Sequence, residues 1–97
     1  AVHSASKAVE LSPRYWKTWA HLGVAHAFNG DAKLAEKALT EALRLAPNNS
    51  NAHYYYAAYL SNYKDRTEHA LDLVRRALEI NPSNSAAARL QQKLRIL

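Results

Sequence analysis

Residues 19–47 read WAHLGVAHAFNGDAKLAEKALTEALRLAP and contain the clearest signals of secondary structure in the chain. It contains two runs rich in helix-forming Ala and Leu, separated by Asn29-Gly30-Asp31. Gly30 can adopt the left-handed conformation that ends a helix, and Asp31 can accept hydrogen bonds from the free N–H groups that begin the next helix. Pro47 stops the second run, because proline lacks a backbone N–H. The stretch therefore predicts a hairpin of two antiparallel helices.

The end of this hairpin recurs along the chain. KAVELSP (7–13), EALRLAP (41–47) and RALEINP (76–82) each combine Ala with aliphatic residues and end in Pro. The three prolines are 34 and 35 residues apart, a spacing typical of stacked helix pairs. Only two glycines interrupt the 97 residues. We therefore expect an all-α stack of antiparallel helix hairpins, with a turn at 64–66 and about six helices: 1–11, 14–28, 32–46, 50–63, 67–80 and 85–96.

The spacing of particular residues carries a family resemblance. The first full repeat reads Trp19-x2-Leu22-Gly23-x2-His26, then Ala35-x3-Leu39, then Pro47. This resembles the tetratricopeptide repeat (TPR) pattern W-x2-L-G-x2-Y…A-x3-F…P, with His26 and Leu39 as mild departures. A looser copy reads His53-x2-Tyr56-Ala57-x2-Leu60, then Ala70-x3-Val74, then Pro82.

The resemblance implies a right-handed solenoid. In that register, residues 1–13 are the second half of a repeat, 14–47 and 48–82 are full repeats, and 83–97 form a C-terminal capping helix. The unpaired first segment also leads us to expect a fragment of a longer array.

The composition offers little for catalysis. Cysteine is absent, which excludes disulfides, thiolate zinc sites and a cysteine nucleophile. His21 and His26 are five residues apart, whereas a helical metal pair such as H-E-x-x-H is spaced by four. The only glycines, Gly23 and Gly30, cannot form a phosphate-binding loop. We expect no enzyme activity, metal or cofactor. No apolar run reaches the length of a membrane span, and a cytoplasmic location is favoured.

A binding surface is the better hypothesis. By the resemblance, the first helix of each repeat lines the concave face of the stack, and this groove would hold a peptide or helical segment of a partner protein. The candidate binding residues are Lys17, Ala20, His21, Val24 and Phe28 in the first full repeat, Asn51, Tyr54, Tyr55, Ala58 and Asn62 in the second, and Arg89 in the last helix.

The chemistry of these positions suggests the partner. Some TPR domains hold acidic chaperone tails with a clamp of Lys, Asn and Arg. Here Ala20, Val24 and Tyr55 stand at the corresponding positions. We therefore expect an apolar or helical partner segment rather than an acidic chaperone tail.

Two other functions stay open from the sequence. The net charge of +5, the tyrosines and the 35-residue spacing would suit an RNA-binding helical repeat, although the inner face carries little Lys or Arg, which makes nucleic acid the weaker partner. The chain could also be a purely structural segment that self-associates through its N-terminal helix, whose apolar face has no partner helix in the sequence.

The stretch HYYYAAYLSNY (53–63) holds five of the six tyrosines. The repeat register places Tyr56 in the core and Tyr59 at a seam between helices, and it leaves Tyr63 near the turn with its hydroxyl in water. Tyr54 and Tyr55 then remain for binding. Trp19 and Leu22 are expected in the core. The register leaves open whether Phe28 and Tyr54 face the groove or pack against a neighbouring helix, and whether Trp16 packs on the preceding helix or stays exposed.

Overall fold

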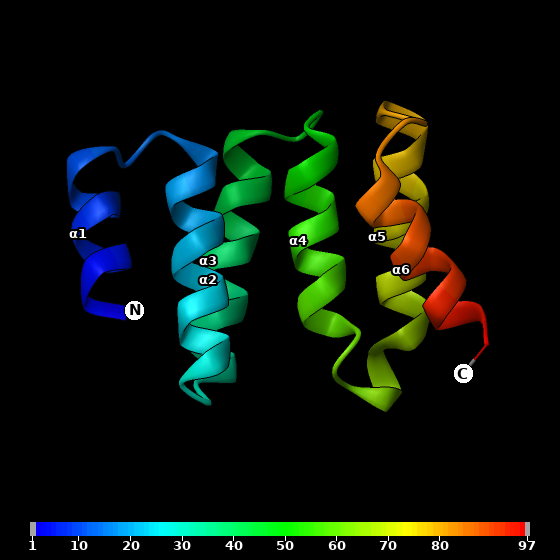
Figure 1. Ribbon diagram of the computed structural model, residues 1–97. Helices are drawn as coiled ribbons and strands as arrows, with labels where there is room; N and C mark the ends of the chain where they lie inside the picture. The colour runs from blue at the N-terminus through cyan, green and yellow to red at the C-terminus, as the bar shows by residue number, and fades with distance from the viewer. Residues whose placement is uncertain (1, 97) are drawn as a thin grey trace. The chain divides into compact units, whose positions relative to one another are not determined.

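A computed structural model describes residues 2–96, apart from the side chains of Val2 and Lys64. The described residues form six α-helices, which confirms the all-α fold class (Figure 1). A 3-10 turn, Lys64–Arg66, occupies the predicted turn. Ala1, the first residue of the predicted helix 1–11, lies outside the described residues. The helices are α1 (Val2–Leu11), α2 (Trp16–Phe28), α3 (Ala32–Leu45), α4 (Ser50–Leu60), α5 (Thr67–Ile80) and α6 (Ser85–Arg95).

Two helices are shorter than the sequence predicted by two residues or more, and α3 and α6 each end one residue early. α2 begins at Trp16 rather than 14, because Tyr15 is extended (φ −97°, ψ 115°) and closes a turn onto the carbonyl of Ser12. α4 ends at Leu60 rather than 63. There the side chains of Ser61 and Asn62 donate hydrogen bonds to backbone carbonyls of the last turn of α4, and polar side chains of this kind compete with helix continuation.

The helix cap predicted at Asp31 is present, and α4 has a cap of the same kind. Asp31 accepts a hydrogen bond from the N–H of Leu34 at 3.2 Å, and Asn49 does the same for Ala52 at 3.1 Å. These bonds satisfy donors that have no partner within the helix. Gly30 has φ +81°, the left-handed conformation expected after α2. Local sequence signals therefore determine where the α2–α3 hairpin turns.

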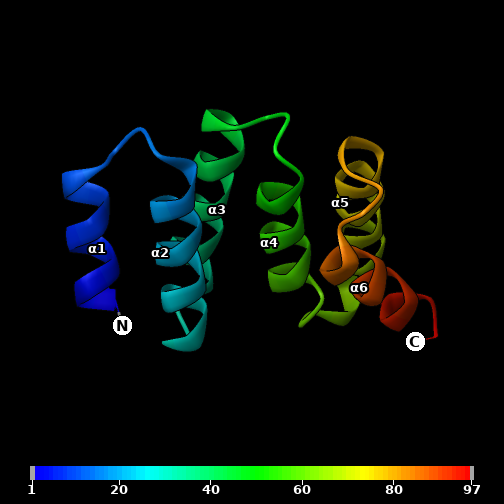
Figure 2. The ribbon, with the colours of Figure 1, turned by 45° about the horizontal axis from the view of Figure 1, so that its top comes forward.

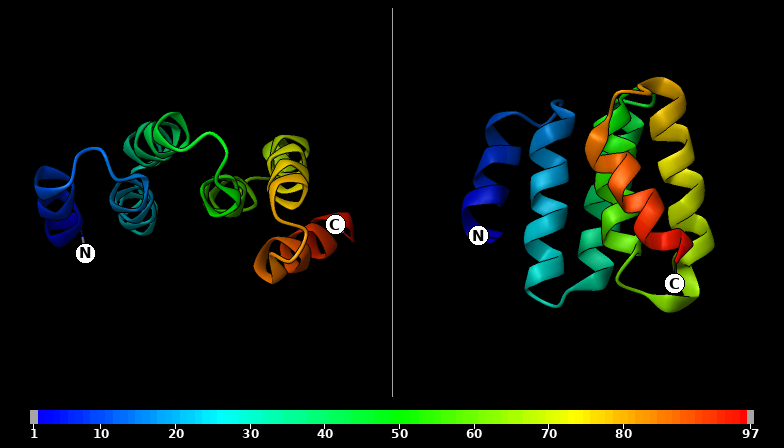
Figure 3. Two further views of the ribbon diagram at one scale, coloured as in Figure 1. Left: turned by 90° about the horizontal axis from the view of Figure 1, so that it is seen from above. Right: turned by 45° about the vertical axis from the view of Figure 1, so that its right-hand side comes forward.

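The chain divides into two compact units, residues 1–47 and 48–97, and each is described by itself. In the first, α2 packs against both α1 and α3, and Figure 2 shows the three helices running alternately up and down. The view from above shows α2 beside α1 on one side and α3 on the other (Figure 3, left). The core of this unit is made of small and medium side chains: Leu22, Ala25, Ala35, Ala38, Leu39 and Ala42.

In the second unit, α5 packs against α4 and α6, and α4 also touches α6 (Figure 3, right). Buried polar groups join the three helices. The Asn84 amide donates to the Ser50 hydroxyl at 2.8 Å, and that hydroxyl donates to the carbonyl of Ala77 at 2.7 Å. Asn84 also accepts from the N–H of Ala87 at 3.1 Å, which caps α6. One side chain therefore caps α6 and ties it to α4.

The burial predicted for the aromatic residues and for Leu22 is partly confirmed. Leu22 and Tyr56 are buried as predicted, and Tyr63 is exposed beside the turn. Trp19 is the exception: it is only half buried, so its prediction as a core residue is wrong. Its indole N–H donates to the carbonyl of Pro13 at 2.7 Å. Because an indole N–H needs a hydrogen-bond acceptor, Trp19 lies where the α1–α2 loop supplies one.

Candidate binding faces

The second unit has a small pocket between α4 and α6. Tyr54 lines it from α4, and Ala86, Arg89, Leu90 and Lys93 line it from α6, around a volume of about 260 Å³. Arg89 and Lys93 are exposed and stand one helical turn apart, so both charges can reach a ligand at this surface. The sequence predicted Tyr54 and Arg89 for this site.

The charge of this face is uniform along α6. Its sequence, SAAARLQQKLR, contains three cations and no acidic residue. The Tyr54 ring packs against the ring of Tyr55 with 5.7 Å between their centroids. An aromatic surface beside two cations can bind a segment that has an apolar side chain next to a carboxylate.

The first unit has a larger and more apolar pocket, between α1 and α2. His21, Val24 and Phe28, all predicted as binding residues, line it together with Ala25, around a volume of about 440 Å³. Phe28 is 88% exposed, which answers the question that the sequence left open for this residue.

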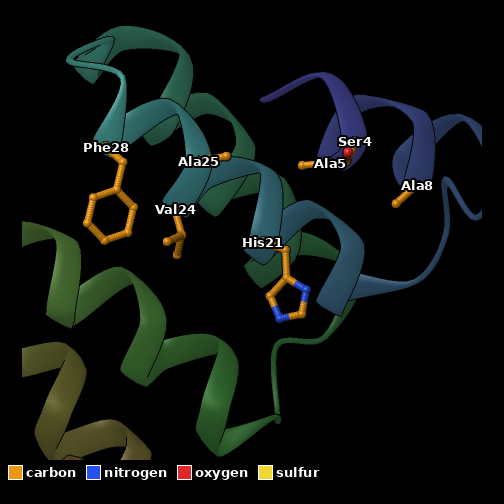
Figure 4. Close-up of a pocket in the computed structure, with 7 residues that line it drawn as sticks. All are labelled: Ser4, Ala5, Ala8, His21, Val24, Ala25 and Phe28. Atoms are coloured by element: carbon orange, nitrogen blue, oxygen red, sulfur yellow. The ribbon is translucent and has the colours of Figure 1, made fainter. Parts of the chain in front are cut away.

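The opposite wall of this pocket was not predicted. It consists of Ser4, Ala5 and Ala8 of α1, and Figure 4 shows Ala5 and Ala25 projecting toward each other across the gap. The signal available in the sequence was the series of small residues on one side of α1. Small side chains also permit close helix packing, so the series alone could not distinguish a wall from a helix contact.

The other predicted binding residues differ in how far their side chains are exposed. Ala20 is 0% exposed, so the expectation that it contacts a ligand is wrong: its methyl group is covered by the fold. Lys17 is exposed, while Tyr55 and Ala58 are half buried. The side chains of Asn51 and Asn62 are exposed but already hold internal hydrogen bonds. Asn51 accepts from Asn84 at 3.1 Å, and Asn62 donates to the carbonyl of Tyr59 at 3.3 Å.

Within residues 2–96, no three His, Asp or Glu side chains are grouped as metal ligands would be. A third hollow, of about 270 Å³ along α5, contains the ion pair of Arg75 with Asp72 at 3.3 Å. None of the described helices combines the length and the apolar character that a membrane crossing requires.

The fold and its repeated hairpins define a helical-repeat protein. A sequence model of the family described as tetratricopeptide repeat matches residues 16–49. A similar solved structure is described as "First TPR of Spaghetti (RPAP3) bound to HSP90 peptide SRMEEVD". It has a TM-score of 0.82 and 19% identity, and the match covers 98% of this chain and 75% of that chain. A comparison with curated proteins finds no match.

Residues 16–49 are therefore a repeat of the tetratricopeptide family, and the described chain has the fold of a TPR domain. The TPR resemblance is thus confirmed for residues 16–49, and the all-α helical-repeat architecture for the described chain.

Proposed function

We propose that this chain is a non-enzymatic protein-interaction module that binds a peptide or helical segment of a partner protein. The TPR repeat at 16–49 and the likeness to a TPR domain that was solved with an HSP90 peptide support this function. The observation that carries it is the pocket of the second unit, where Tyr54, Arg89 and Lys93 converge on one exposed surface.

The proposed partner surface includes both predicted faces, each taken by itself. In the first unit it consists of Lys17, His21, Val24 and Phe28, and in the second of Tyr54, Tyr55 and Arg89. A single concave groove that joins the two faces stays a prediction of the repeat pattern.

We further propose that apolar contacts contribute more to the affinity than ionic ones. Arg89 and Lys93 are exposed, and an ion pair in water contributes only about 0–1 kcal/mol. Contact with the half-buried Tyr54 ring removes apolar surface from water and is not weakened by salt. The similar TPR domain was solved with an acidic peptide, so the two contributions need a direct comparison.

The test uses labelled SRMEEVD and the variant SRMQQVD, with fluorescence anisotropy as the readout. We expect Tyr54→Ala to weaken binding of SRMEEVD about tenfold or more, which corresponds to about 1.4 kcal/mol. Replacing both Glu of the peptide should weaken binding by less than about fivefold. Arg75→Ala is the matched control for Arg89→Ala, because Arg75 is also exposed but pairs with Asp72 on α5.

Two results would contradict the proposal. If Tyr54→Ala and Arg89→Ala leave the affinity unchanged in a folded protein, the face of the second unit does not bind the peptide. If SRMQQVD fails to bind while SRMEEVD binds tightly, ionic contacts dominate and the apolar preference is wrong.

A further inference from the structure

The outer sides of α3 and α5, opposite the buried core, can be compared position by position. The segments EALRLAP (41–47) and RALEINP (76–82) end the two helices and set a register of 35 residues between them. In this register the buried sides agree, because each residue there has a small or aliphatic equivalent. Ala35, Leu39 and Ala42 correspond to Ala70, Val74 and Ala77, all of them 0% exposed.

The charges on the outer sides are reversed between the two helices. The α3 stripe consists of Lys33, Lys37, Glu41 and Arg44, and its equivalents, the α5 stripe, are Glu68, Asp72, Arg76 and Glu79. Each stripe follows helical spacing and lies along one side of its helix. Glu41 is half buried, and the other seven side chains are exposed. Each cation of one stripe thus corresponds to an acid of the other.

An exposed leucine and a shallow hollow lie beside the stripes. Leu34, next to Lys33 on α3, is 43% exposed. The hollow on α5, of about 270 Å³, is lined by Glu68, Leu71, Asp72 and Arg75. If the two stripes face each other with the helices parallel and in register, helical geometry brings Leu34 to the edge where Leu71 lies. The hollow can then take the Leu34 side chain and remove part of it from water.

We propose that α3 of one copy of this chain docks on α5 of a second copy, with the two helices parallel and in register. Lys33 then meets Glu68 of the second copy, and Lys37 meets Asp72 of the second copy. The contact uses the outer sides of α3 and α5 and not the face around Tyr54. It is therefore an interaction beyond the proposed peptide binding.

Two carboxylates of the stripes are already paired within their own helices. Glu41 holds Arg44, and Asp72 holds Arg75 at 3.3 Å. A carboxylate has two oxygens and can accept hydrogen bonds from a further cation. The side chains of Asp72 and Arg75 also remain 69% and 67% exposed, so this pair stays open to a second molecule.

The charges also select the partner helix and its direction. In an antiparallel alignment Lys37 would face Arg76 of the second copy, and Glu41 would face Asp72. Two α3 stripes in parallel would place like charges together at every position. Because like charges disfavour an interface, parallel pairing of unlike stripes alone satisfies all four positions among these alignments. Since each copy has one stripe of each kind, the contact can close a ring or extend as a chain.

Reversing the charge of one stripe at a time tests the contact. Sedimentation of the full chain is measured at low ionic strength, because exposed ion pairs are weak and salt screens them. Lys33→Glu with Lys37→Glu gives α3 the acids of the α5 stripe, and Glu68→Lys with Asp72→Lys gives α5 the cations of the α3 stripe. We expect each double variant alone to associate about tenfold or more weakly than the unmodified chain. An equimolar mixture of the two should regain the original association to within about threefold, because each acidic α3 then meets a basic α5.

Control variants are matched to these changes. Lys7→Glu with Arg14→Glu alters the net charge as much as the acidic α3 variant, but at exposed positions outside both stripes, and should leave association within about twofold. Leu34→Ala should weaken association about threefold or more. Leu11→Ala, which shortens a leucine that is 79% exposed, should not weaken it.

Two further measurements separate this contact from folding and from peptide binding. Circular dichroism verifies that the variants keep their helices. At the low protein concentrations of the anisotropy measurement, the affinity for SRMEEVD should be unchanged in both double variants. Loss of self-association and loss of the peptide-binding function can therefore be distinguished.

Three results would overturn the proposal. The first is an unmodified chain that stays monomeric at its highest soluble concentration and at low salt. The second is a double variant that associates as tightly as the unmodified chain, which would mean that the copies meet elsewhere. The third is a mixture of the two double variants that associates no better than either alone, since contact between the α3 and α5 stripes requires that it be restored.

Discussion

Gly23 of α2 lies directly against Leu39 of α3. A Cβ atom at Gly23 would fall 2.6 Å from Leu39 Cγ and 3.1 Å from the carbonyl oxygen of Ala35. Leu39 is fully buried, so its side chain has little space to move. The absence of a side chain at position 23 therefore sets the distance between the two helices.

The Gly23→Ala variant tests this contact. Helix propensity alone would make Ala more stable than Gly by about 1 kcal/mol. We expect the opposite sign, a net loss of about 1–3 kcal/mol in the free energy of unfolding, because overpacking forces α2 and α3 apart. Urea denaturation measures the change. Combining Gly23→Ala with Leu39→Ala should cost less than the sum of the two single changes, since the second removes the clash. If the costs of the two single changes simply add, a clash between position 23 and Leu39 does not cause the loss.

Asn84 provides a second prediction, about the buried polar groups of the second unit. Asn84→Ala removes the cap of α6 and the donor to Ser50, so we expect a loss of about 1–3 kcal/mol. Asn49→Ala removes the cap of α4 and should cost about 1 kcal/mol. Asn84→Asp keeps the cap acceptor but lacks the donor. If it is as stable as the natural protein in urea, the bond to Ser50 contributes nothing.

Neighbouring tyrosines of α4 should respond differently to substitution. Tyr56 is 7% exposed and packs against Tyr59 and His69, with ring centroids 6.3 and 5.7 Å away. Tyr56→Ala should therefore lower the free energy of unfolding by about 3–5 kcal/mol, as expected for a buried aromatic residue. Tyr54 is only half buried, so Tyr54→Ala should cost less than half as much while weakening peptide binding. Equal losses of stability would remove the distinction between a core and a surface tyrosine.

The pair of Glu41 and Arg44 on α3 predicts a shift that titration can detect. Arg44 Nε donates to Glu41 Oε1 at 2.8 Å, and its Nη2 contacts the same oxygen. These hydrogen bonds hold the pKa of Glu41 below its ordinary value of 4.5. Because the pKa is lower in the folded state, the pair stabilises the fold above pH 4.5, and this contribution disappears as the pH falls through the folded-state pKa. In Arg44→Gln the Glu41 pKa, followed by NMR, should rise toward 4.5. Arg75→Gln should leave it unchanged.

The hydrogen bond from Trp19 to the carbonyl of Pro13 should hold α1 in place. Trp19→Phe keeps an aromatic ring but removes the donor, at an expected cost of about 1 kcal/mol. We expect amide hydrogen exchange to become faster in α1, with no change in α5. Uniformly faster exchange in both units would show a global rather than a local effect.

The sequence predicted what depends on neighbouring residues. The N-caps at Asp31 and Asn49 and the left-handed Gly30 depend on residues within a few positions, so their signals are visible in the sequence. The repeated prolines likewise place the helix boundaries to within three residues. The early end of α4 escaped prediction because hydrogen bonds of Ser61 and Asn62 to the backbone act against an otherwise helical sequence.

The candidate sites were less predictable, because exposure depends on which helix covers a position. Ala20 and Val24 both belong to the predicted face of α2, yet the fold buries Ala20 and leaves Val24 half buried at a pocket. Ser4, Ala5 and Ala8 form a pocket wall because α1 packs beside α2. The helical periodicity of α1 alone, or of α2 alone, therefore does not predict this wall.

The hydrogen bonds at the α1–α2 loop fasten one end of the pocket between α1 and α2. Near the loop, the side chains of Thr18 and Trp19 donate to the carbonyls of Ser12 and Pro13. At the other end, the described side chains of α1 that line the pocket are the small ones of Ser4 and Ala5. A tilt of α1 about the fastened loop would therefore change the width mainly beside Phe28. The pocket would then accept side chains of different size beside Phe28 while its width near the loop stays constant.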